Sequence, residues 1–317
     1  KEHGFLDISP CDILDEFGEK SIVVENDGVY EEATIPGRKP LRELTKEEIT
    51  ALVEAFAEKG IKKVRLTGGE PLIREDIADI AKALKNVKGI EALYITTNGI
   101  LLSEKAKALK EAGVDGVNIS LDTLDSEMYK ALTGEDGLER VLSGIESALS
   151  ENFKRVRINS VLVRNKNDGE AQKLILLARD KKIDVRFIEL MPFSAQGENE
   201  KLLVTASELL ERFPFLSPEE RKEEGAAEYY TAEGFSGRIG FISPRSAKFC
   251  GSCNRIRVLS DGKIKPCLGN SMAYDVRDII FDKEKLSQRI DEIIFNKPAS
   301  HHFEDGEKFR NLSLIGG

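Results

Sequence analysis

The chain has 317 residues, of which 40% are hydrophobic and 32% charged, a composition typical of a folded protein with room for one large α/β domain and a smaller second part. The formal net charge of −9 argues against nucleic acid or an anionic membrane surface as a partner. No apolar run reaches the roughly 18 residues of a spanning helix and no signal peptide is visible, so we expect a cytoplasmic protein.

Hydrophobic periodicity alternates between helix and strand through about the first 195 residues. Residues 45–60 carry one apolar helical stripe, Thr45 and Glu48 have the spacing of a capping box, and Gly60 is a stop signal. Such alternation predicts parallel strands covered by helices, in a barrel or an open sheet. The other predicted elements are strands at 5–9, 64–67, 93–96, 117–121, 155–163 and 185–190, and helices at 77–84, 103–112, 138–149 and 169–181.

The pattern changes after about residue 193. Residues 194–227 are polar and show no clear strand. Short strands are predicted at 229–231, 238–242 and 255–259, and a last helix at 283–295. We therefore expect two domains, 1–195 and 196–317.

Polar residues follow the predicted strands of the first domain. In parallel α/β folds the carboxyl ends of the strands are where ligands bind. We therefore expect a binding site built from these segments, which are Gly68-Gly69-Glu70, Thr97-Asn98-Gly99, Asp122-Thr123 and Met191-Pro192.

Three of the four cysteines, Cys250, Cys253 and Cys267, lie close together in the sequence. Three thiolates can hold a 4Fe-4S cube and leave its fourth iron open, or they can bind zinc together with one further ligand. The spacing leaves iron–sulfur and zinc open, beside a purely structural role. The fourth zinc ligand would be one of Cys11, His301 and His302.

Two arginines follow the second of these cysteines. Arg255 and Arg257 are two residues apart in a predicted strand, so both side chains point to the same face. A solvated strand face is the usual explanation of such a pair. Their position beside the cysteines favours binding of an anion or a nucleobase instead.

Gly68-Gly69-Glu70-Pro71, directly after a predicted strand, resembles the GGEP motif of the radical S-adenosylmethionine superfamily. The surrounding sequence narrows the resemblance to the GTP 3',8-cyclase family, over about residues 40–317. The segments that carry it are Arg65–Leu72, Thr96–Gly99, Asn118–Asp122, Arg186–Met191, the three cysteines with Arg255 and Arg257, and the terminal Ile315-Gly316-Gly317.

The resemblance implies an α/β fold, an incomplete parallel (β/α)6 barrel over 1–195 with a C-terminal iron–sulfur α+β extension over 196–317. It implies a lyase that converts GTP to (8S)-3',8-cyclo-7,8-dihydroguanosine 5'-triphosphate in molybdenum cofactor biosynthesis. The implied partners are GTP, S-adenosylmethionine, an electron donor, a second copy of the chain in a homodimer, and the next enzyme of the pathway.

The resemblance also assigns residues. No catalytic side chain is among them. Arg157 stands where the family usually has Lys, so a planar fork replaces a point charge. The implied contacts are Gly69, Glu70, Ser120 and Met191 for S-adenosylmethionine, Arg65, Thr96, Arg157, Arg255 and Arg257 for GTP, and Cys250, Cys253 and Cys267 for the C-terminal 4Fe-4S cluster.

A second, N-terminal 4Fe-4S cluster is expected of the family, held by CxxxCxxC in the loop after the first strand, but its ligands are not found. Counted from Cys11, the other two positions hold Asp15 and Gly18, while Phe17 stands where the motif often has an aromatic. Alternatively, Asp15-x-Phe17-Gly18 matches the family's opening D-x-F-G, and the first strand and cluster loop are deleted. The family's N-terminal GTP-contacting Arg has no match either.

Residues 1–40 are thus a degenerate or deleted cluster region, either a damaged or frameshifted reading of a normal enzyme or a derived homologue. Three functions stay open on the sequence. They are the complete cyclase, a catalytically inactive homologue that binds one 4Fe-4S cluster and a guanine nucleotide, and a zinc-stabilised binding protein.

Overall fold

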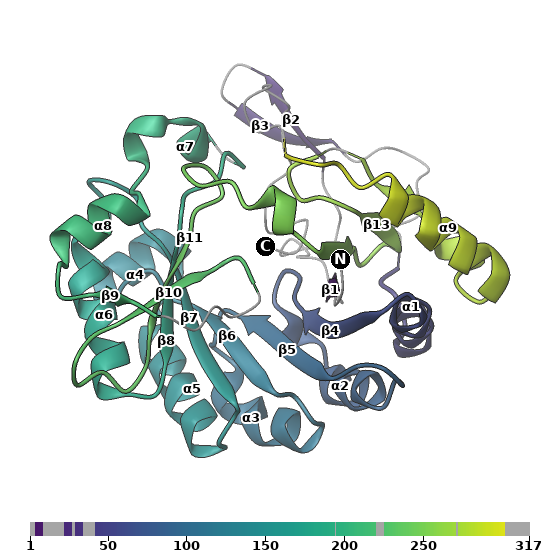
Figure 1. Ribbon diagram of the computed structural model, residues 1–317, viewed down its shortest axis with the longest axis horizontal. Coiled ribbons are helices and arrows are strands. Elements are labelled where there is room, and N and C mark those ends of the chain that lie inside the picture. Colours follow the sequence, from purple (N-terminus) through teal and green to yellow (C-terminus); the bar gives the residue numbers. More distant parts are fainter. Residues whose placement is uncertain are drawn as a thin grey trace.

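The computed structural model describes residues 4–8, 22–26, 29–33, 42–193, 195–219, 225–270 and 272–301 (Figure 1). Within these residues the main sheet has 12 strands in the order β14-β13-β12-β1-β4-β5-β6-β7-β8-β11-β10-β9, and β2 and β3 form a separate antiparallel pair. From β12 to β11 all neighbouring strands are parallel. The strands of this parallel run are β12 (Arg255–Val258), β1 (Gly4–Ile8), β4 (Ile61–Leu66), β5 (Ala92–Thr97), β6 (Gly116–Ser120), β7 (Arg155–Val161), β8 (Asp184–Ile188) and β11 (Ile239–Ile242).

Antiparallel strands complete both edges of the main sheet, and helices follow most of the parallel strands along the chain. Figure 1 shows α1, α2, α3, α5 and α6 around the outside of these strands. The remaining strands are β2 (Ile22–Asn26), β3 (Val29–Ala33), β9 (Ser217–Pro218), β10 (Glu228–Thr231), β13 (Lys263–Lys265) and β14 (Tyr274–Asp275). The helices are α1 (Lys46–Glu58), α2 (Ile77–Lys85), α3 (Leu102–Glu111), α4 (Ser126–Thr133), α5 (Leu138–Ser150), α6 (Ala171–Asp180), α7 (Ala195–Glu198), α8 (Ala206–Arg212) and α9 (Lys283–Phe295).

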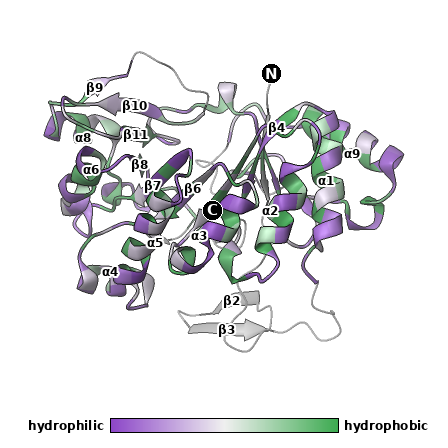
Figure 2. Ribbon diagram, turned by 90° about the horizontal axis from the view of Figure 1, so that it is seen from below, coloured by the Kyte–Doolittle hydropathy of each residue, from purple (hydrophilic) through white to green (hydrophobic). Residues whose placement is uncertain are grey.

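Local sequence signals explain where the helices begin and end. Thr45 and Glu48 form the expected capping box of α1, and Gly60, just past its end, has a φ of +90° that suits glycine. The predicted apolar stripe of α1, including Leu52 and Phe56, is completely buried. Figure 2 shows hydrophobic and hydrophilic residues alternating around α1 and α2, as expected of helices that cover a sheet on one side.

The predicted incomplete barrel is confirmed, with two additions. Residues 4–8 supply the expected first strand. The strands β11 and β12, which come from the second half of the chain, continue the parallel sheet beside β8 and β1. No ladder joins β11 to β12 among the described residues, so the sheet stays open there. The division near residue 195 stays a prediction.

Two helices lie where the sequence gave no periodic signal. The α8 helix falls in the segment described above as polar, and Thr205 and Glu208 cap it with a second capping box. The α4 helix starts at an Asp125 cap and ends at Gly134, and it buries only Tyr129. Both are short, so a stripe has too few turns to stand out. In the part of the chain that is described, no helix is both long enough and apolar enough to cross a membrane.

Candidate functional site

The register of the parallel strands gathers the predicted GTP residues on one face of the sheet. Residues that pair across neighbouring parallel strands point to the same side. Arg65 on β4 and Arg257 on β12 flank the same residue, Asp7 of β1. Thr96 on β5 and Arg157 on β7 flank Asn118 of β6. Each pair therefore shares a face.

Tyr94 connects the pair that contains Arg65 to the pair that contains Arg157. It pairs with Arg65 in the sheet register, and the guanidinium of Arg157 lies over its ring, 5.6 Å from the centroid. On β12 the burial alternates, so Arg255 shares the face of Arg257, and its guanidinium lies 5.2 Å from the ring centroid of Phe249. The strand register thus brings Arg65, Thr96, Arg157, Arg255 and Arg257 to one side of the sheet, and their contacts with GTP stay a prediction.

Arg186 on β8 is a further arginine of this face that the sequence analysis did not assign. Its Nη2 donates to Asn118 Oδ1 at 2.8 Å and its Nε to Asn159 Oδ1 at 2.9 Å. Burial, joined by the charges of Arg157 and Arg65, lowers the pKa of Arg186 to about 9. The group stays charged at neutral pH, so several cations share a confined space. The signal in the sequence was an Arg between the apolar residues Val185 and Phe187 of a predicted strand.

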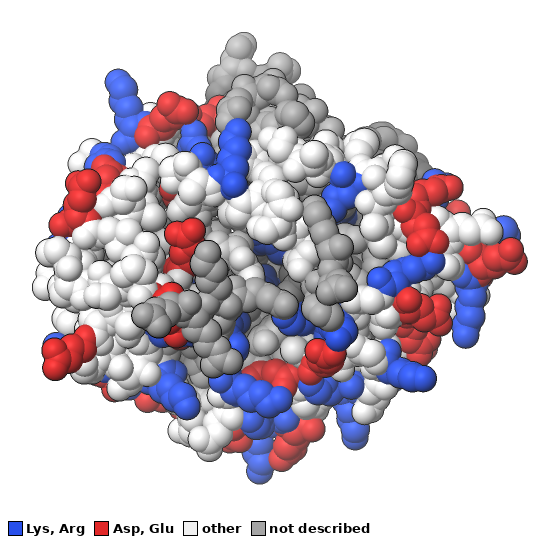
Figure 3. All heavy atoms as spheres, viewed as in Figure 1, with Lys and Arg blue, Asp and Glu red and all other residues white. Residues whose placement is uncertain are grey.

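One acidic group lies among these arginines in the part of the chain that the structure describes. Asp184, at the start of β8, lies 3.7 Å from Arg157 Nε. The same carboxylate accepts from Arg238 at 3.0 and 2.6 Å. Figure 3 shows Lys and Arg atoms in the hollow at the centre of this face of the molecule. An anionic ligand is the natural partner of such a face.

Glu70 of the Gly-Gly-Glu-Pro segment connects the loop after β4 to the loop after β5 by hydrogen bonds. Its carboxylate accepts from Thr97 Oγ1 and the Asn98 backbone N–H, both at 2.6 Å, and from the Leu72 N–H at 3.0 Å. Burial raises its pKa, against the effect of these hydrogen bonds. The loop it holds turns at Gly99, where φ is +85° and a Cβ would lie 2.9 Å from Ile119. Glu70 therefore ties the loop after β4 to the loop after β5.

The other predicted cofactor residues lie on the same edge. Gly69 follows β4, Ser120 ends β6 and is exposed, and Met191 follows β8 and is half-buried. All three are at the carboxyl ends of parallel strands, where ligands of such folds bind. No described contact joins them to one another.

Asp122, two residues past β6, is a half-buried residue at this edge. It accepts from the Val161 N–H at 2.7 Å. Burial raises its pKa to about 6, although this hydrogen bond opposes the shift. The folded state therefore holds a proton on Asp122 that the unfolded chain has lost above about pH 4.

We expect Asp122→Asn to stabilise the protein above pH 6. With a folded pKa above the unfolded value, the parent loses stability as pH rises from about 4 to 6, on the order of 2–3 kcal/mol. Asn cannot ionise and so escapes this loss. Thermal unfolding at pH 4.5 and pH 7.5 checks it: the variant should gain on the parent only at the higher pH, and exposed Asp136→Asn should not. Equal gains at both pH values would contradict the expectation.

The cysteines surround a short turn and a hairpin. Cys250 opens the 3-10 turn Cys250–Ser252, Cys253 precedes β12, and Cys267 follows β13. All three are free thiols and half-buried. Burial raises the pKa of Cys267, as do the charges of Cys253 and Cys250, so both of these thiols lie within electrostatic reach of Cys267. Burial also raises the pKa of Cys253, but Arg255 and Lys297 lower it more, so its thiolate is favoured.

Three thiolates are the donor set that a 4Fe-4S cube with one open iron needs. Among the described residues, no three His, Cys, Asp or Glu side chains converge as the ligands of one metal ion do. In a 4Fe-4S cluster each cysteine binds its own iron, so the sulfurs are held apart by the cube. His301, one candidate for a fourth zinc ligand, instead places its Nε2 2.9 Å from the Pro244 carbonyl oxygen.

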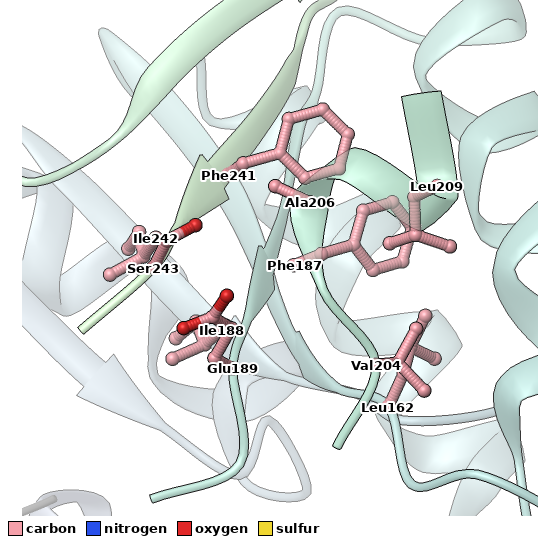
Figure 4. A pocket seen from close by; sticks show the side chains of 10 residues that line it. All are labelled: Leu162, Phe187, Ile188, Glu189, Val204, Ala206, Leu209, Phe241, Ile242 and Ser243. Atoms are coloured by element: carbon pink, nitrogen blue, oxygen red, sulfur yellow. The ribbon is translucent and has the colours of Figure 1, made fainter. Parts of the chain in front are cut away.

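Two hollows elsewhere do not contain the predicted site. A cavity of about 10 Å³ between β8, β11 and α8 is lined mainly by apolar side chains, among them Phe187 and Phe241, and can hold about one water (Figure 4). A hollow of about 480 Å³ lies over α1 and the start of α9. Neither is lined by a residue assigned to GTP, S-adenosylmethionine or a cluster.

Comparisons with known proteins give the family. The Radical SAM superfamily model matches residues 20–178 and the Molybdenum Cofactor Synthesis C model residues 183–303. A GTP 3',8-cyclase of Clostridium perfringens is 44% identical over 86% of this chain and 87% of its own. One of Alkaliphilus oremlandii is 42% identical over 86% of this chain and 87% of its own. The chain belongs to the GTP 3',8-cyclase family.

A solved structure supports the fold independently. Streptococcus suis SuiB, in a crystal structure bound to S-adenosylmethionine, has a TM-score of 0.55 at 15% identity, covering 99% of this chain and 75% of that one. The chain is therefore a radical S-adenosylmethionine enzyme in family and fold, and that superfamily implies a 4Fe-4S cluster and S-adenosylmethionine as cofactors.

The family's N-terminal cluster segment falls outside the described residues. That holds for Cys11, Asp15, Phe17 and Gly18, and also for His302 and the terminal Gly-Gly. The residues present there do not fit the first cluster, since the sequence offers one thiolate where three are needed. Asp is a poor replacement for a thiolate on iron.

Proposed function

We propose that this protein carries the substrate and cofactor pocket of a GTP 3',8-cyclase and serves in molybdenum cofactor biosynthesis. The reaction converts GTP to (8S)-3',8-cyclo-7,8-dihydroguanosine 5'-triphosphate. One observation carries the proposal: Arg65, Arg157 and Arg186 lie close enough for their charges to interact, on the sheet face that Arg257 shares. An anion bound among these cations would lower their mutual repulsion.

GTP has the chemistry that an arginine-rich face attracts. Its triphosphate carries about four negative charges, and guanidinium forks bind phosphate oxygens in pairs. Arg65, Arg157, Arg255 and Arg257 are the proposed contacts, with Thr96 beside them. Gly69, Ser120 and Met191 would line the S-adenosylmethionine side, on a pocket edge that Glu70 holds in shape.

Cys250, Cys253 and Cys267 are the proposed ligands of the C-terminal 4Fe-4S cluster. An iron without a protein ligand would offer a binding position for the guanine. Arg255 supports this arrangement, because its charge reaches Cys253 while its side chain belongs to the arginine face. Reductive cleavage of S-adenosylmethionine consumes an electron, so the reaction also needs an electron donor. The product passes to the next enzyme of the pathway, and a homodimer stays a prediction.

A second candidate is an inactive homologue that binds a guanine nucleotide and one cluster. Asp15 and Gly18 favour it, because they fill positions where the family needs thiolates. Anaerobic reconstitution separates the candidates: about eight irons per chain support the complete enzyme and about four the one-cluster protein. Zinc without iron would point to the third function, a zinc-stabilised binding protein.

GTP is expected to bind at least about 100-fold more tightly than guanosine, because each charge-assisted hydrogen bond to phosphate contributes about 1.5–3 kcal/mol. The difference should shrink as salt rises. Isothermal titration calorimetry at low and high salt measures both. Arg65→Ala should weaken GTP but not guanosine, while Arg140→Ala, an exposed control on α5, should change neither. Equal affinities for GTP and guanosine would overturn the proposed function.

A further inference from the structure

Lys297, immediately after α9, fastens together the two segments that carry Cys253 and Cys267. Its Nζ donates to the Arg255 carbonyl and to the Pro266 carbonyl, both at 2.6 Å. The first belongs to the residue two past Cys253, and the second to the residue just before Cys267. One ammonium thereby ties the start of β12 to the chain that leaves β13.

The same ammonium lies against the sulfur. Lys297 Nζ is 3.9 Å from Cys253 Sγ. An ammonium is a compact charge with three donors, so it can satisfy two carbonyls and still face a sulfur. The end of α9 suits a cation, because the helix dipole is negative there.

We infer that Lys297 is a positioning residue of the C-terminal cluster, holding the Cys253 and Cys267 segments in register and raising the cluster's reduction potential through its charge. The inference rests on the assignment of Cys250, Cys253 and Cys267 to that cluster under the proposed function. A reduced cluster carries one more negative charge than an oxidised one, so a fixed cation beside its sulfurs favours reduction. Net charge and hydrogen bonds to the sulfurs are established determinants of such potentials.

Lys297 also links the cluster to the nucleotide. The carbonyl that it binds belongs to Arg255, whose side chain lies over Phe249 on the proposed GTP face. Moving the ammonium would therefore disturb the sulfur and the arginine strand together. A residue 44 positions from Cys253 in the sequence can therefore affect both the binding of the cluster and the binding of GTP.

The test compares four variants of the full chain, reconstituted anaerobically with iron and sulfide. Lys297→Met removes charge and donors, Lys297→Gln keeps a donor without the charge, and Lys297→Arg keeps the charge. Lys283→Met, at the exposed start of the same helix, makes the same charge change away from the cysteines. The readouts are the midpoint potential of the cluster, followed by electron paramagnetic resonance, and the rate of iron loss to a chelator.

Lys297→Met and Lys297→Gln should both shift the midpoint potential to more negative values. The potential of Lys297→Arg should stay close to that of the parent, and the potential of Lys283→Met should equal it. Iron loss should be several-fold faster for Met than for Gln, because Gln can still donate to one carbonyl. If Met does not retain iron at all, the Gln and Arg variants decide: retention by Arg over Gln supports the inference, and equal behaviour overturns it.

An unchanged potential in both Lys297→Met and Lys297→Gln overturns the inference alone, provided that the parent binds about four irons and GTP. A parent chain that binds no iron overturns the inference together with the cluster assignment of the proposed function. GTP binding that fails while the Lys297 variants shift the potential as expected would remove the proposed substrate and leave the role of Lys297 intact.

Discussion

The chain with this sequence, reconstituted anaerobically and given GTP, S-adenosylmethionine and dithionite, is expected to form no 5'-deoxyadenosine above a cluster-free control. Radical formation needs an open iron that chelates the cofactor and passes it an electron, and that iron must be the fourth corner of a cube on three thiolates. The N-terminal segment supplies only Cys11. Product analysis by liquid chromatography and mass spectrometry measures the outcome.

The C-terminal cysteines cannot substitute in this step. Cys253 is followed at once by β12, whose Arg255 and Arg257 belong to the face proposed for GTP. A cluster held there would meet the nucleotide, whereas Gly69 and Ser120 lie at the ends of other strands, β4 and β6. The chain should therefore still bind S-adenosylmethionine weakly without turnover. Formation of 5'-deoxyadenosine well above the control would mean that another ligand set supports the first cluster.

Restoring the motif with Asp15→Cys and Gly18→Cys is the complementary experiment. The first strand is present: β1 pairs with β4 and β12 and ends at Ile8, three residues before Cys11. This position favours Cys11 as a relic of the family's motif over a deletion of strand and loop. We expect the double variant to gain about four irons over the parent. No gain would favour the deletion or frameshift instead.

Local pattern was enough to predict the elements that pack by themselves. The stripe of α1 and its capping box, the strand alternation that puts Arg255 and Arg257 on one face, and the bounds of α9 follow from neighbouring residues. What the sequence could not reveal depends on contacts between distant segments. The strands β12 and β11 pair with β1 and β8, at the two ends of the parallel run. Both come from the second half of the chain, so no pattern of neighbouring residues indicates these pairings.

The site shows the same division. Motif positions led to Arg65, Arg157 and the cysteines. They did not lead to Arg186 and Lys297, which lie beside these residues in the fold. Arg186 matters because Asn118 and Asn159 of neighbouring strands hold it beside other arginines. Lys297 matters because it follows α9 in the sequence yet donates to the Arg255 and Pro266 carbonyls, beside two of the cysteines. Glu70, expected to contact the cofactor, is also tied to the next loop, and its contact with the cofactor stays a prediction.

Replacing any one of Cys250, Cys253 and Cys267 by Ala is expected to reduce bound iron from about four per chain to near zero, because two thiolates hold a cube too weakly to survive purification. The fourth cysteine provides a matched control: Cys11→Ala should leave iron unchanged. Iron and sulfide analysis, together with the visible absorption of the reconstituted protein, measures both. GTP affinity should fall in the three variants as well, since the proposed open iron and the position of β12 are lost with the cluster.

The same set of variants tests iron against zinc. If the three cysteines held one zinc ion with a fourth protein ligand, the parent would bind about one zinc and no iron, and the Ala variants would unfold more readily without a change in visible absorption. If Cys11 were part of the C-terminal site, Cys11→Ala would lose metal with the others. We expect neither, because three thiolates are the ligand set of a cube with one open iron, and His301, a candidate fourth zinc ligand, places its Nε2 2.9 Å from the Pro244 carbonyl oxygen. Iron retained in full by Cys267→Ala would contradict the proposed cluster directly.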